Sequence, residues 1–426
     1  MLKDVLALVI FTLSLLAVLT RPRGISEAVS SVAGAALMLL ATIVPVSQAA
    51  HLLLDSWNVL LFFAGLVLVS WATEQSGFFR WIALWAGRLA GGDTRRLLLN
   101  VFGLGVLIST FLSNDATALL LTPVVVALTQ EIDLPALPFA LACTFIADTA
   151  SVTLPVSNPI NVLFLESFRG IHLGAYLQHL LLPSLAAITI NIAVFLLLFR
   201  GKTGPSFRGA ALTAPREAIK EPRFFRYTLV CLAILCPAYL AGSLLGWPLS
   251  LVALAGAAAL VLGGIGFGAL PAAQVRHSPW TIVPFIAGLL VLVQGLENAG
   301  VSAWLGTQLV NAAGHGRLPG VLATVFGSAL GANLLNNVPM ATVLASSIRG
   351  AHVRPLALRR GLIYAAIFGC DIGPNLTIVG SLSTILWLVL LRGRGVQVTS
   401  WQYIRTGLIV TPPMLLAGAL LIVLLR

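Results

Sequence analysis

The strongest constraint on the fold is an internal repeat, in which the second half of the chain matches the first at a constant offset. Asn337 follows Asn114 by 337 − 114 = 223 positions. The same offset joins further identical residues without a gap, namely Trp57 and Trp280, Gly65 and Gly288, Glu74 and Glu297, Gly77 and Gly300, Trp81 and Trp304, Phe145 and Phe368, and Asp148 and Asp371. Such matches indicate two copies of one structural unit, and the copies dictate the architecture.

The repeated unit consists of apolar segments that suit membrane-spanning helices. Of the 426 residues, 58% are hydrophobic and 9% are charged, whereas an average soluble domain carries about 25% charged residues. Spans are expected at 2–20, 26–46, 58–73, 137–168 and 175–199, and at 227–245, 249–267, 281–296, 361–391 and 404–425. The chain is therefore predicted to be an all-α polytopic membrane protein in a lipid bilayer.

Five spans per half is an odd number, so the two halves should have opposite orientations in the membrane. We predict two inverted-topology repeats of five transmembrane helices, residues 1–200 and 226–426, joined by a solvated cytoplasmic linker at 201–225. With the linker inside, 17 of the 25 Lys and Arg residues are cytoplasmic and 25 − 17 = 8 are not. This bias places both termini outside, and it explains the net charge of +11 without a nucleic-acid partner.

Each half also contains a polar island between two apolar arms. Residues 112–117 lie between arms at 97–111 and 117–128, and residues 334–339 lie between arms at 319–333 and 340–348. A helical arm of about 15 residues extends about 23 Å, short of the roughly 30 Å hydrocarbon core. Both islands are therefore predicted to be tips of re-entrant helical hairpins. Irregular backbone at membrane depth is tolerated where it lines a cavity, so the tips should form a site.

The spans 137–168 and 361–391 are each predicted to be a broken helix. Prolines and polar residues interrupt them at 154–159 and 371–375, and a proline inside a helix removes an amide donor. Breaks of this kind expose backbone N–H and C=O groups at mid-membrane.

Two further segments connect the spans to the hairpins. The stretch 77–89 carries both Trp and Arg, which predicts a helix in the membrane interface, and 303–313 is its counterpart in the second half. Glu74 and Glu297 precede these segments at the ends of spans, and we interpret them as hinge positions.

Three acidic residues, Asp115, Asp148 and Asp371, lie deep in spans or hairpins, and acidic groups there are functional candidates. No Lys or Arg is near them in sequence. A carboxylate that is removed from water and has no cation partner takes up a proton more readily, so the three are proton-coupling candidates. The structural alternative is that each caps the end of a broken helix.

Neutral hydrogen-bonding residues accompany these acids. The predicted substrate-binding residues are Ser113, Asn114, Asp115, Thr117, Ser157, Asn158, Asn336, Asn337, Thr377 and Ser381. A site of amides, hydroxyls and carboxylates without a fixed cation suits a small neutral polyhydroxylated solute or a cation, although any one hydroxyl can instead bond to its own helix. Cys143, Cys231, Cys236 and Cys370 show no metal-ligand spacing. We predict no cofactor and no metal.

Three of these stretches resemble one known family, the bacterial arsenite efflux permeases of the ion-transporter superfamily. Residues 112–123, LSNDATALLLTP, resemble its first-hairpin signature, and residues 335–339, LNNVP, resemble its second tip. Residues 371–377, DIGPNLT, with 380–387, GSLSTILW, are similar to its last broken helix. Asn375 departs from the lysine that we expect in better-known members.

The resemblance implies export of arsenite, as As(OH)3, and of antimonite, driven by proton entry across the bacterial inner membrane. It also implies two hairpins that meet at a central site. Some members of the family dock a soluble cytoplasmic ATPase subunit.

Two alternatives to this reading remain at this point. One is a sodium- or proton-coupled carrier of another small ion or a carboxylate on the same scaffold, against which the Ser-Asn-Asp tip at 113–115 argues. The other is an integral-membrane enzyme, which would need a convergent nucleophile–base or metal constellation. All six histidines fall at expected span ends or loops, so we predict that the protein is not an enzyme. A purely structural scaffold would need neither broken helices nor intramembrane acids.

Overall fold

The computed structural model describes residues 2–20, 25–168, 171–204, 206–207, 212–245, 247–271, 280–301, 304, 307–308, 311–312, 316–351, 356–381, 383–384, 387–388, 391 and 394–425. Within these ranges the chain forms helices and no strand. The principal α-helices of the first half are α1 (Leu2–Thr20), α2 (Glu27–Leu40), α3 (Val46–Asp55), α4 (Trp57–Gln75), α5 (Phe78–Leu89), α6 (Thr94–Phe111), α7 (Thr122–Glu131), α8 (Ala136–Ala150), α9 (Pro159–Ser167) and α10 (Leu173–Leu198). Those of the second half are α11 (Pro222–Leu245), α12 (Leu249–Gly266), α13 (Ile282–Asn298), α15 (Arg317–Leu335), α16 (Asn337–Gly350), α17 (Leu356–Ile372) and α19 (Ser400–Leu424).

The all-helical membrane architecture is confirmed, because the described residues include five helices that are individually long and apolar enough to cross a bilayer. Both predicted helix breaks are present. A 3-10 turn at Pro155–Ser157 separates α8 from α9, and two more, at Gly373–Leu376 and Ile378–Gly380, follow α17. One helix was not predicted: α3 follows α2 directly, in a stretch that the hydrophobic pattern left unassigned.

Helix packing follows the internal repeat. The contact of α4 with α12 has its counterpart in that of α13 with α2, and α6 with α8 has its counterpart in α15 with α17. The pairs α1–α2 and α11–α12 correspond in the same way. Two copies of one unit predict such matched pairings, while their opposite orientation in the membrane stays a prediction.

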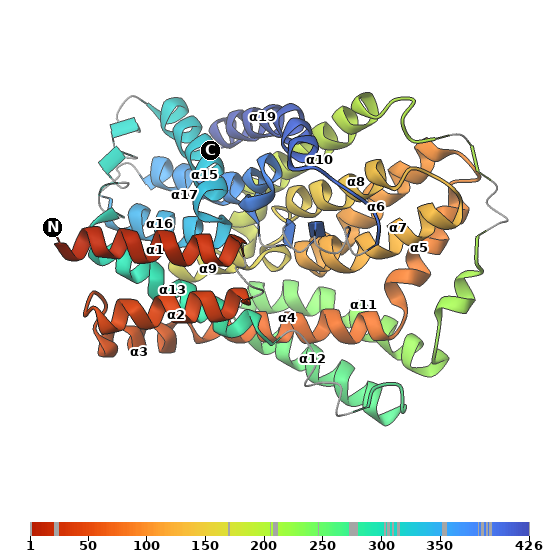
Figure 1. Ribbon diagram of the computed structural model, residues 1–426, viewed down its shortest axis with the longest axis horizontal. Coiled ribbons are helices and arrows are strands. Elements are labelled where there is room, and N and C mark those ends of the chain that lie inside the picture. The colour runs from red at the N-terminus through yellow and green to blue at the C-terminus, as the bar shows by residue number, and fades with distance from the viewer. Residues whose placement is uncertain are drawn as a thin grey trace.

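The helices divide into two groups, each with its own hydrophobic core. The scaffold group consists of α1–α4 and α11–α13, and its core includes Phe62, Met38 and Leu289. The hairpin group consists of α5–α10, α15–α17 and α19, and its core includes Phe145 and Trp387. In Figure 1, α4 and α12 of the scaffold group run along the lower edge, and α10 and α19 of the hairpin group run along the upper edge.

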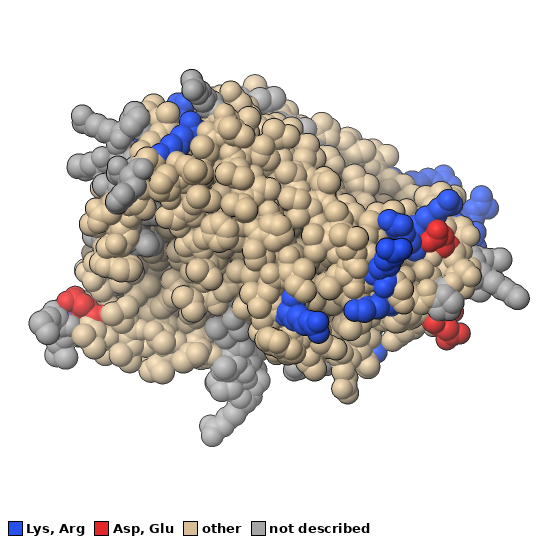
Figure 2. Space-filling view, turned by 90° about the horizontal axis from the view of Figure 1, so that it is seen from above, with Lys and Arg blue, Asp and Glu red and all other residues tan. Residues whose placement is uncertain are grey.

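Charged side chains lie at the two ends of the molecule. Figure 2 shows most Lys and Arg at the end where the chain passes from α10 to α11, a few at the opposite end, and an uncharged surface between them. The exposed basic residues of the first end include Arg95, Arg96, Arg200, Lys202, Arg216, Lys220, Arg223 and Arg226. An uncharged belt between charged ends is the surface that a membrane-spanning protein requires.

The incoming arm of each hairpin is longer than predicted. Helix α6 has 18 residues and α15 has 19, so each extends about 27 Å or slightly more, close to the hydrocarbon thickness. The prediction of two short arms is therefore wrong for these helices. The predicted apolar arms began after charged residues, whereas the helices begin before or at them. Asp93 caps α6 by accepting bonds from the N–H groups of Arg95 and Arg96, and Arg317 is the first residue of α15.

Part of the linker is packed onto the hairpin group, while Lys202, Ser206 and Arg216 are exposed, so its place as a solvated cytoplasmic loop stays a prediction. The N–H of Phe207 donates to the Gly92 carbonyl at 2.9 Å, and Phe207, Leu212 and Ala218 are buried. The N–H and hydroxyl of Thr213 both donate to Glu131 Oε1, at 2.7 and 2.6 Å. The linker therefore contacts both the residues that follow α5 and the C-terminal end of α7.

The hinge interpretation of the paired glutamates agrees with the local geometry. Gly77 has φ +85° and Gly300 has φ +83°, and their N–H groups donate to the carbonyls of Glu74 and Glu297 at 3.0 and 2.9 Å. A glycine in the left-handed backbone conformation, which glycine adopts most readily, thus follows the end of both α4 and α13. Helix α5 begins at once after Gly77, whereas parts of 303–313 lie outside the described residues.

Candidate functional site

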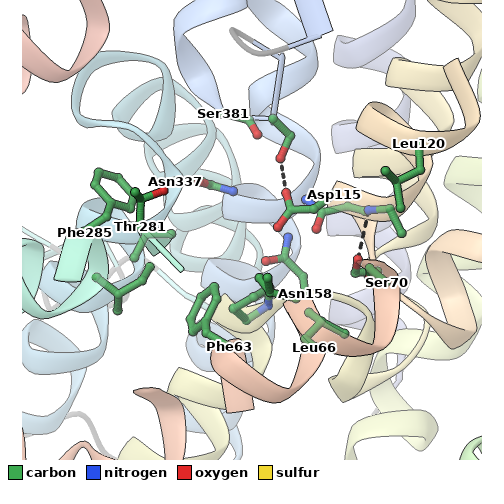
Figure 3. A pocket seen from close by; sticks show the side chains of 18 of the residues that line it. Phe63, Leu66, Ser70, Asp115, Leu120, Asn158, Thr281, Phe285, Asn337 and Ser381 are labelled. Carbon is green, nitrogen blue, oxygen red and sulfur yellow. Dashed lines mark hydrogen bonds between the residues drawn. The ribbon is translucent and has the colours of Figure 1, made fainter. Parts of the chain in front are cut away.

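Both hairpin tips line one cavity, which lies between the scaffold group and the hairpin group and has a volume of about 370 Å³ (Figure 3). The hairpin group contributes Ser113, Asn114, Asp115, Ala116, Leu120, Asn158, Pro159, Asn336, Asn337, Val338, Ser381 and Ser383. The tips come from opposite halves of the chain, and seven of the predicted substrate-binding residues are in this list. The structure therefore brings together residues that are more than two hundred positions apart in sequence.

The first tip turns because α6 ends at Phe111 and its polar side chains satisfy the freed backbone. Ser113 Oγ accepts a bond from the N–H of Ala116 at 3.0 Å, and the Thr117 hydroxyl donates to the Ser113 carbonyl at 3.2 Å. A π-helical turn, Ala116–Leu121, then leads into α7. Turns of this kind often occur at functional positions in helices.

The second tip depends on Asn336, whose φ is +73°. Asparagine adopts positive φ more readily than most residues with a side chain. Its Oδ1 accepts a bond from the N–H of Val338 at 3.4 Å and so caps α16. Its Nδ2 is buried, and among the described residues it has no hydrogen-bond partner. The second tip thus contains a buried amide donor that no described residue satisfies.

Two amides that line the cavity connect it to the buried acids behind its wall. Asn114 Nδ2 donates to Asp148 Oδ1 at 3.3 Å, and Asn158 Nδ2 donates to Asp371 Oδ1 at 2.5 Å. Asp148 and Asp371 are at most 2% exposed and do not line the cavity themselves. In both, Oδ2 is buried without a partner among the described residues. Each acid is therefore connected to the cavity wall by a hydrogen bond from one amide.

Asn158 is held in place by its position at a helix start. Its Oδ1 caps α9 by accepting a bond from the N–H of Ile160 at 3.2 Å, which leaves Nδ2 free to reach Asp371. The Asn-Pro sequence begins the helix, because proline at the first position needs no N–H partner.

The third acid, Asp115, lies on the cavity wall itself. Its Oδ1 accepts a hydrogen bond from the hydroxyl of Ser383, which belongs to the segment after the second helix break (Figure 3). Asp148 and Asp371 lie behind that wall, each bonded to one of the lining amides described above. The acids thus form a series that leads from the cavity into the hairpin group.

Three predicted substrate-binding residues do not line the cavity. Thr117 bonds to the first tip as described, Ser157 donates to the Thr110 carbonyl at 2.8 Å, and Thr377 donates to Asn333 Oδ1 at 2.7 Å. These hydroxyls satisfy backbone or amide oxygens at the helix breaks, so their contacts here are structural.

The scaffold group forms the opposite wall, which sequence reasoning did not find. This wall is mainly apolar and includes Phe63, Leu66, Phe285 and Ile286, with Ser70, Glu74 and Thr281 as polar members (Figure 3). The sequence feature that pointed to Glu74 was its match with Glu297 at the repeat offset. Its position at the end of a span concealed that it faces the cavity.

Asn375, where we expect a lysine from the family resemblance, is fully buried. Its Nδ2 donates to Thr149 Oγ1 at 3.1 Å, and Thr149 Oγ1 also accepts a bond from Asn191 Nδ2 at 2.8 Å. A neutral amide network therefore stands where a cation is expected.

No Lys or Arg is among the described residues that line the cavity. In the part of the chain that the structure describes, no group of three or more His, Cys, Asp or Glu residues could hold a metal. Cys143 and Cys370 are buried and do not line the cavity, and neither does Cys231. The side chain of Cys236 lies outside the described residues.

Comparison with known proteins finds one family over nearly the whole chain. Residues 6–425 match the ArsB family model, described as arsenical pump membrane protein. The arsenical pump membrane protein of Escherichia coli strain K12 is 34% identical over 414 residues, covering 96% of both chains. A putative arsenical pump membrane protein of Bacillus subtilis is 24% identical, covering 94% of this chain and 95% of the relative.

Two solved transporters share the fold. The YdaH transporter of Alcanivorax borkumensis, whose topology is described as unusual, superposes with a TM-score of 0.51 at 18% identity, covering 86% of this chain and 84% of that one. MtrF of Neisseria gonorrhoeae, from a class of antimetabolite efflux pumps, superposes with a TM-score of 0.57 at 12% identity, covering 99% and 94%. At these identities the similarity concerns the fold alone.

Proposed function

The chain belongs to the arsenical pump membrane protein family, and from this premise we propose that it exports arsenite, as As(OH)3, and antimonite in exchange for protons. The family consists of membrane transporters and not enzymes, and its bacterial members lie in the inner membrane. The proton exchange and the two named substrates are the proposal.

One observation carries it: two cavity-lining amides, Asn114 and Asn158, each donate to a buried acid that has no cation partner among the described residues. A hydroxylated neutral solute needs donors and acceptors on the cavity wall, and the tips supply them. A proton carrier needs carboxylates shielded from bulk water, and Asp148 and Asp371 meet that need.

Competition between solute and proton would couple the two fluxes. Protons that enter from outside load one or both of Asp148 and Asp371, and protonation removes acceptor capacity from the amide–carboxylate network. The network then holds the As(OH)3 hydroxyls less well, which favours their release outward. Loss of the protons on the inner side restores the solute site. Asp115, on the cavity wall beside both tips, is the third proton-coupling candidate.

Exchange requires only that the solute and the proton compete for part of one site. The described lining of the cavity has carboxylates and no Lys or Arg, which disfavours anions, so the neutral hydrated form of arsenite suits it better than a carboxylate substrate. A soluble ATPase subunit, as the family resemblance implies, would dock at the basic end of the molecule seen in Figure 2.

The proposal is tested in everted membrane vesicles that contain the protein. Arsenite should accumulate inside when the lumen is acidic, and accumulation should collapse when an ionophore removes the pH gradient. A sodium gradient imposed in place of the pH gradient is the control. Accumulation that follows sodium, or uptake of a dicarboxylate with no effect of arsenite, would support the alternative carrier instead.

A further inference from the structure

A second hollow lies at the basic end of the molecule, between the start of α6 and the end of α10. Its volume is about 510 Å³. The lining residues, called the α6–α10 groove below, are Arg95, Leu98, Ala193, Leu196, Leu197, Phe199, Arg200, Gly201 and Thr203. The groove thus combines an apolar lining with two arginines, and it is separate from the central cavity.

The two arginine side chains of the groove have no hydrogen-bond or ion-pair partner among the described residues. The nearest acid in sequence is Asp93, and it is engaged elsewhere: it caps α6 and its Oδ2 lies 3.8 Å from Nε of Arg96. The groove therefore presents two guanidinium groups that no described acid neutralises, beside an apolar surface, and this arrangement suits an anionic ligand.

At the equivalent place in the second half, an arginine side chain bridges the two corresponding helices. Arg317, the repeat mate of Thr94 since 317 − 94 = 223, donates to the carbonyls of Ile422 and Leu425 at 3.1 and 2.7 Å. It thereby ties α15 to the end of α19. In the first half Thr94 lies instead 3.2 Å from the hydroxyl oxygen of Thr203, which follows the end of α10.

The two groove arginines also lack repeat mates. Position 95 + 223 = 318 is Leu318, and position 200 + 223 = 423 is Val423. The arginine pair of the groove therefore has no counterpart at the pseudo-equivalent positions of the second half. That asymmetry suits a ligand found mainly in one leaflet.

We propose that the α6–α10 groove binds an anionic phospholipid of the leaflet at the linker end. The guanidinium groups of Arg95 and Arg200 hold the phosphate, because arginine donates two parallel hydrogen bonds to such an oxyanion. Leu98, Leu196 and Leu197 contact the acyl chains, and Leu197 is 72% exposed on the outer surface of α10, where lipid would lie. Basic pockets between transmembrane helices on the cytoplasmic side are established binding places for anionic headgroups.

The test measures lipid binding to the full-length protein purified in detergent. Native mass spectrometry should show phosphatidylglycerol retained at occupancies well above those of phosphatidylcholine. Each arginine near an anionic headgroup strengthens binding by a factor of about five, so the Arg95→Gln, Arg200→Gln double variant should bind about 25-fold more weakly. The matched control is Arg216→Gln with Arg223→Gln, which removes the same charge from the same end of the molecule but lies outside the groove.

Three results would overturn the proposal. An equal loss in the control variant would mean that net charge attracts the lipid. Unchanged binding in the groove variant would place the lipid elsewhere. Thermal stabilisation by inorganic phosphate as large as that by phosphatidylglycerol would identify a site for a free anion. Should the double variant fail to fold, the single variants Arg95→Gln and Arg200→Gln decide, each with an expected loss of about fivefold.

Discussion

Asn158 donates a hydrogen bond of 2.5 Å to Asp371 and so joins the helix break of the first half to the broken helix of the second. Asp148 is the repeat mate of Asp371, but its amide partner is Asn114 of the first tip. The repeat mate of Asn158 is Ser381, since 381 − 158 = 223, and Ser381 lines the cavity. Two acids at equivalent positions thus have different amide partners, so each is tested by its own variant.

The coupling proposal predicts that the variants Asp148→Asn and Asp371→Asn lose proton-driven arsenite export but keep part of their arsenite exchange. Gradient-driven arsenite export should fall to background, because the neutral amide cannot take up a proton, whereas arsenite exchange at equal pH on both sides should persist in part. The two assays are run on the same vesicles, with the exposed Asp55→Asn as the control acid. Normal export by both variants would move the proton elsewhere and make Asp115 the next candidate.

A cysteine-free variant is predicted to export arsenite. Arsenic(III) held by three thiolates would leave too slowly for a carrier, and neither Cys143, Cys231 nor Cys370 lines the cavity. Replacing all four cysteines by Ala or Ser should leave export within about twofold of the wild type, as for substitutions that make no contact with a site. Loss of transport in a folded variant, verified by its elution as a single peak in detergent, would indicate a thiol-based site.

The orientation of the linker can be measured in that cysteine-free background. Ser206 is exposed, and a cytoplasmic linker predicts that Ser206→Cys resists a membrane-impermeant thiol reagent in intact cells. The same cysteine should react in everted vesicles, which expose the cytoplasmic side and serve as the positive control. Labelling in intact cells would reverse the orientation drawn from the basic residues but would leave the internal repeat intact.

Close packing at the second helix break predicts that Gly373→Ala is destabilising. A Cβ at Gly373 would lie 2.5 Å from Cα and 2.8 Å from the carbonyl oxygen of Ala329 on α15, so the backbones would have to separate. Such overpacking costs about 1–3 kcal/mol, and it should lower the melting temperature of the purified protein. Gly327→Ala on α15 is the control, since nothing lies within 4 Å of its added Cβ. Equal melting temperatures would show that the contact can relax.

Helix positions were largely predictable because their signals are local. Apolar runs, prolines and caps act within a few residues, although the capping box of Thr399 and Gln402 begins α19 at Ser400, before the predicted start at 404. The internal repeat predicted both hairpin tips and both breaks. An error arose where a local signal ends early: charged residues in the first turns of α6 and α15 hid the length of the incoming arms.

Site residues were only partly predictable, because a hydroxyl or amide can bond to its own backbone or face a cavity. Asn114, Asn158 and Ser381 line the cavity as expected, whereas Ser157 and Thr377 bond inside the hairpin group. That choice depends on which carbonyls the packing leaves free, and these carbonyls come from distant segments.

The sequence by itself determined that the chain is a repeated helical membrane protein, where its helices break, and which acids lie within the apolar spans. Those properties follow from hydrophobicity and backbone restrictions along neighbouring residues. Tertiary structure alone decided that Glu74 faces the tips, that Asn158 reaches Asp371, and that the groove beside Arg95 stays open. Each of these contacts joins residues far apart in the chain, and its energy depends on the packing of whole helices, which no local pattern encodes.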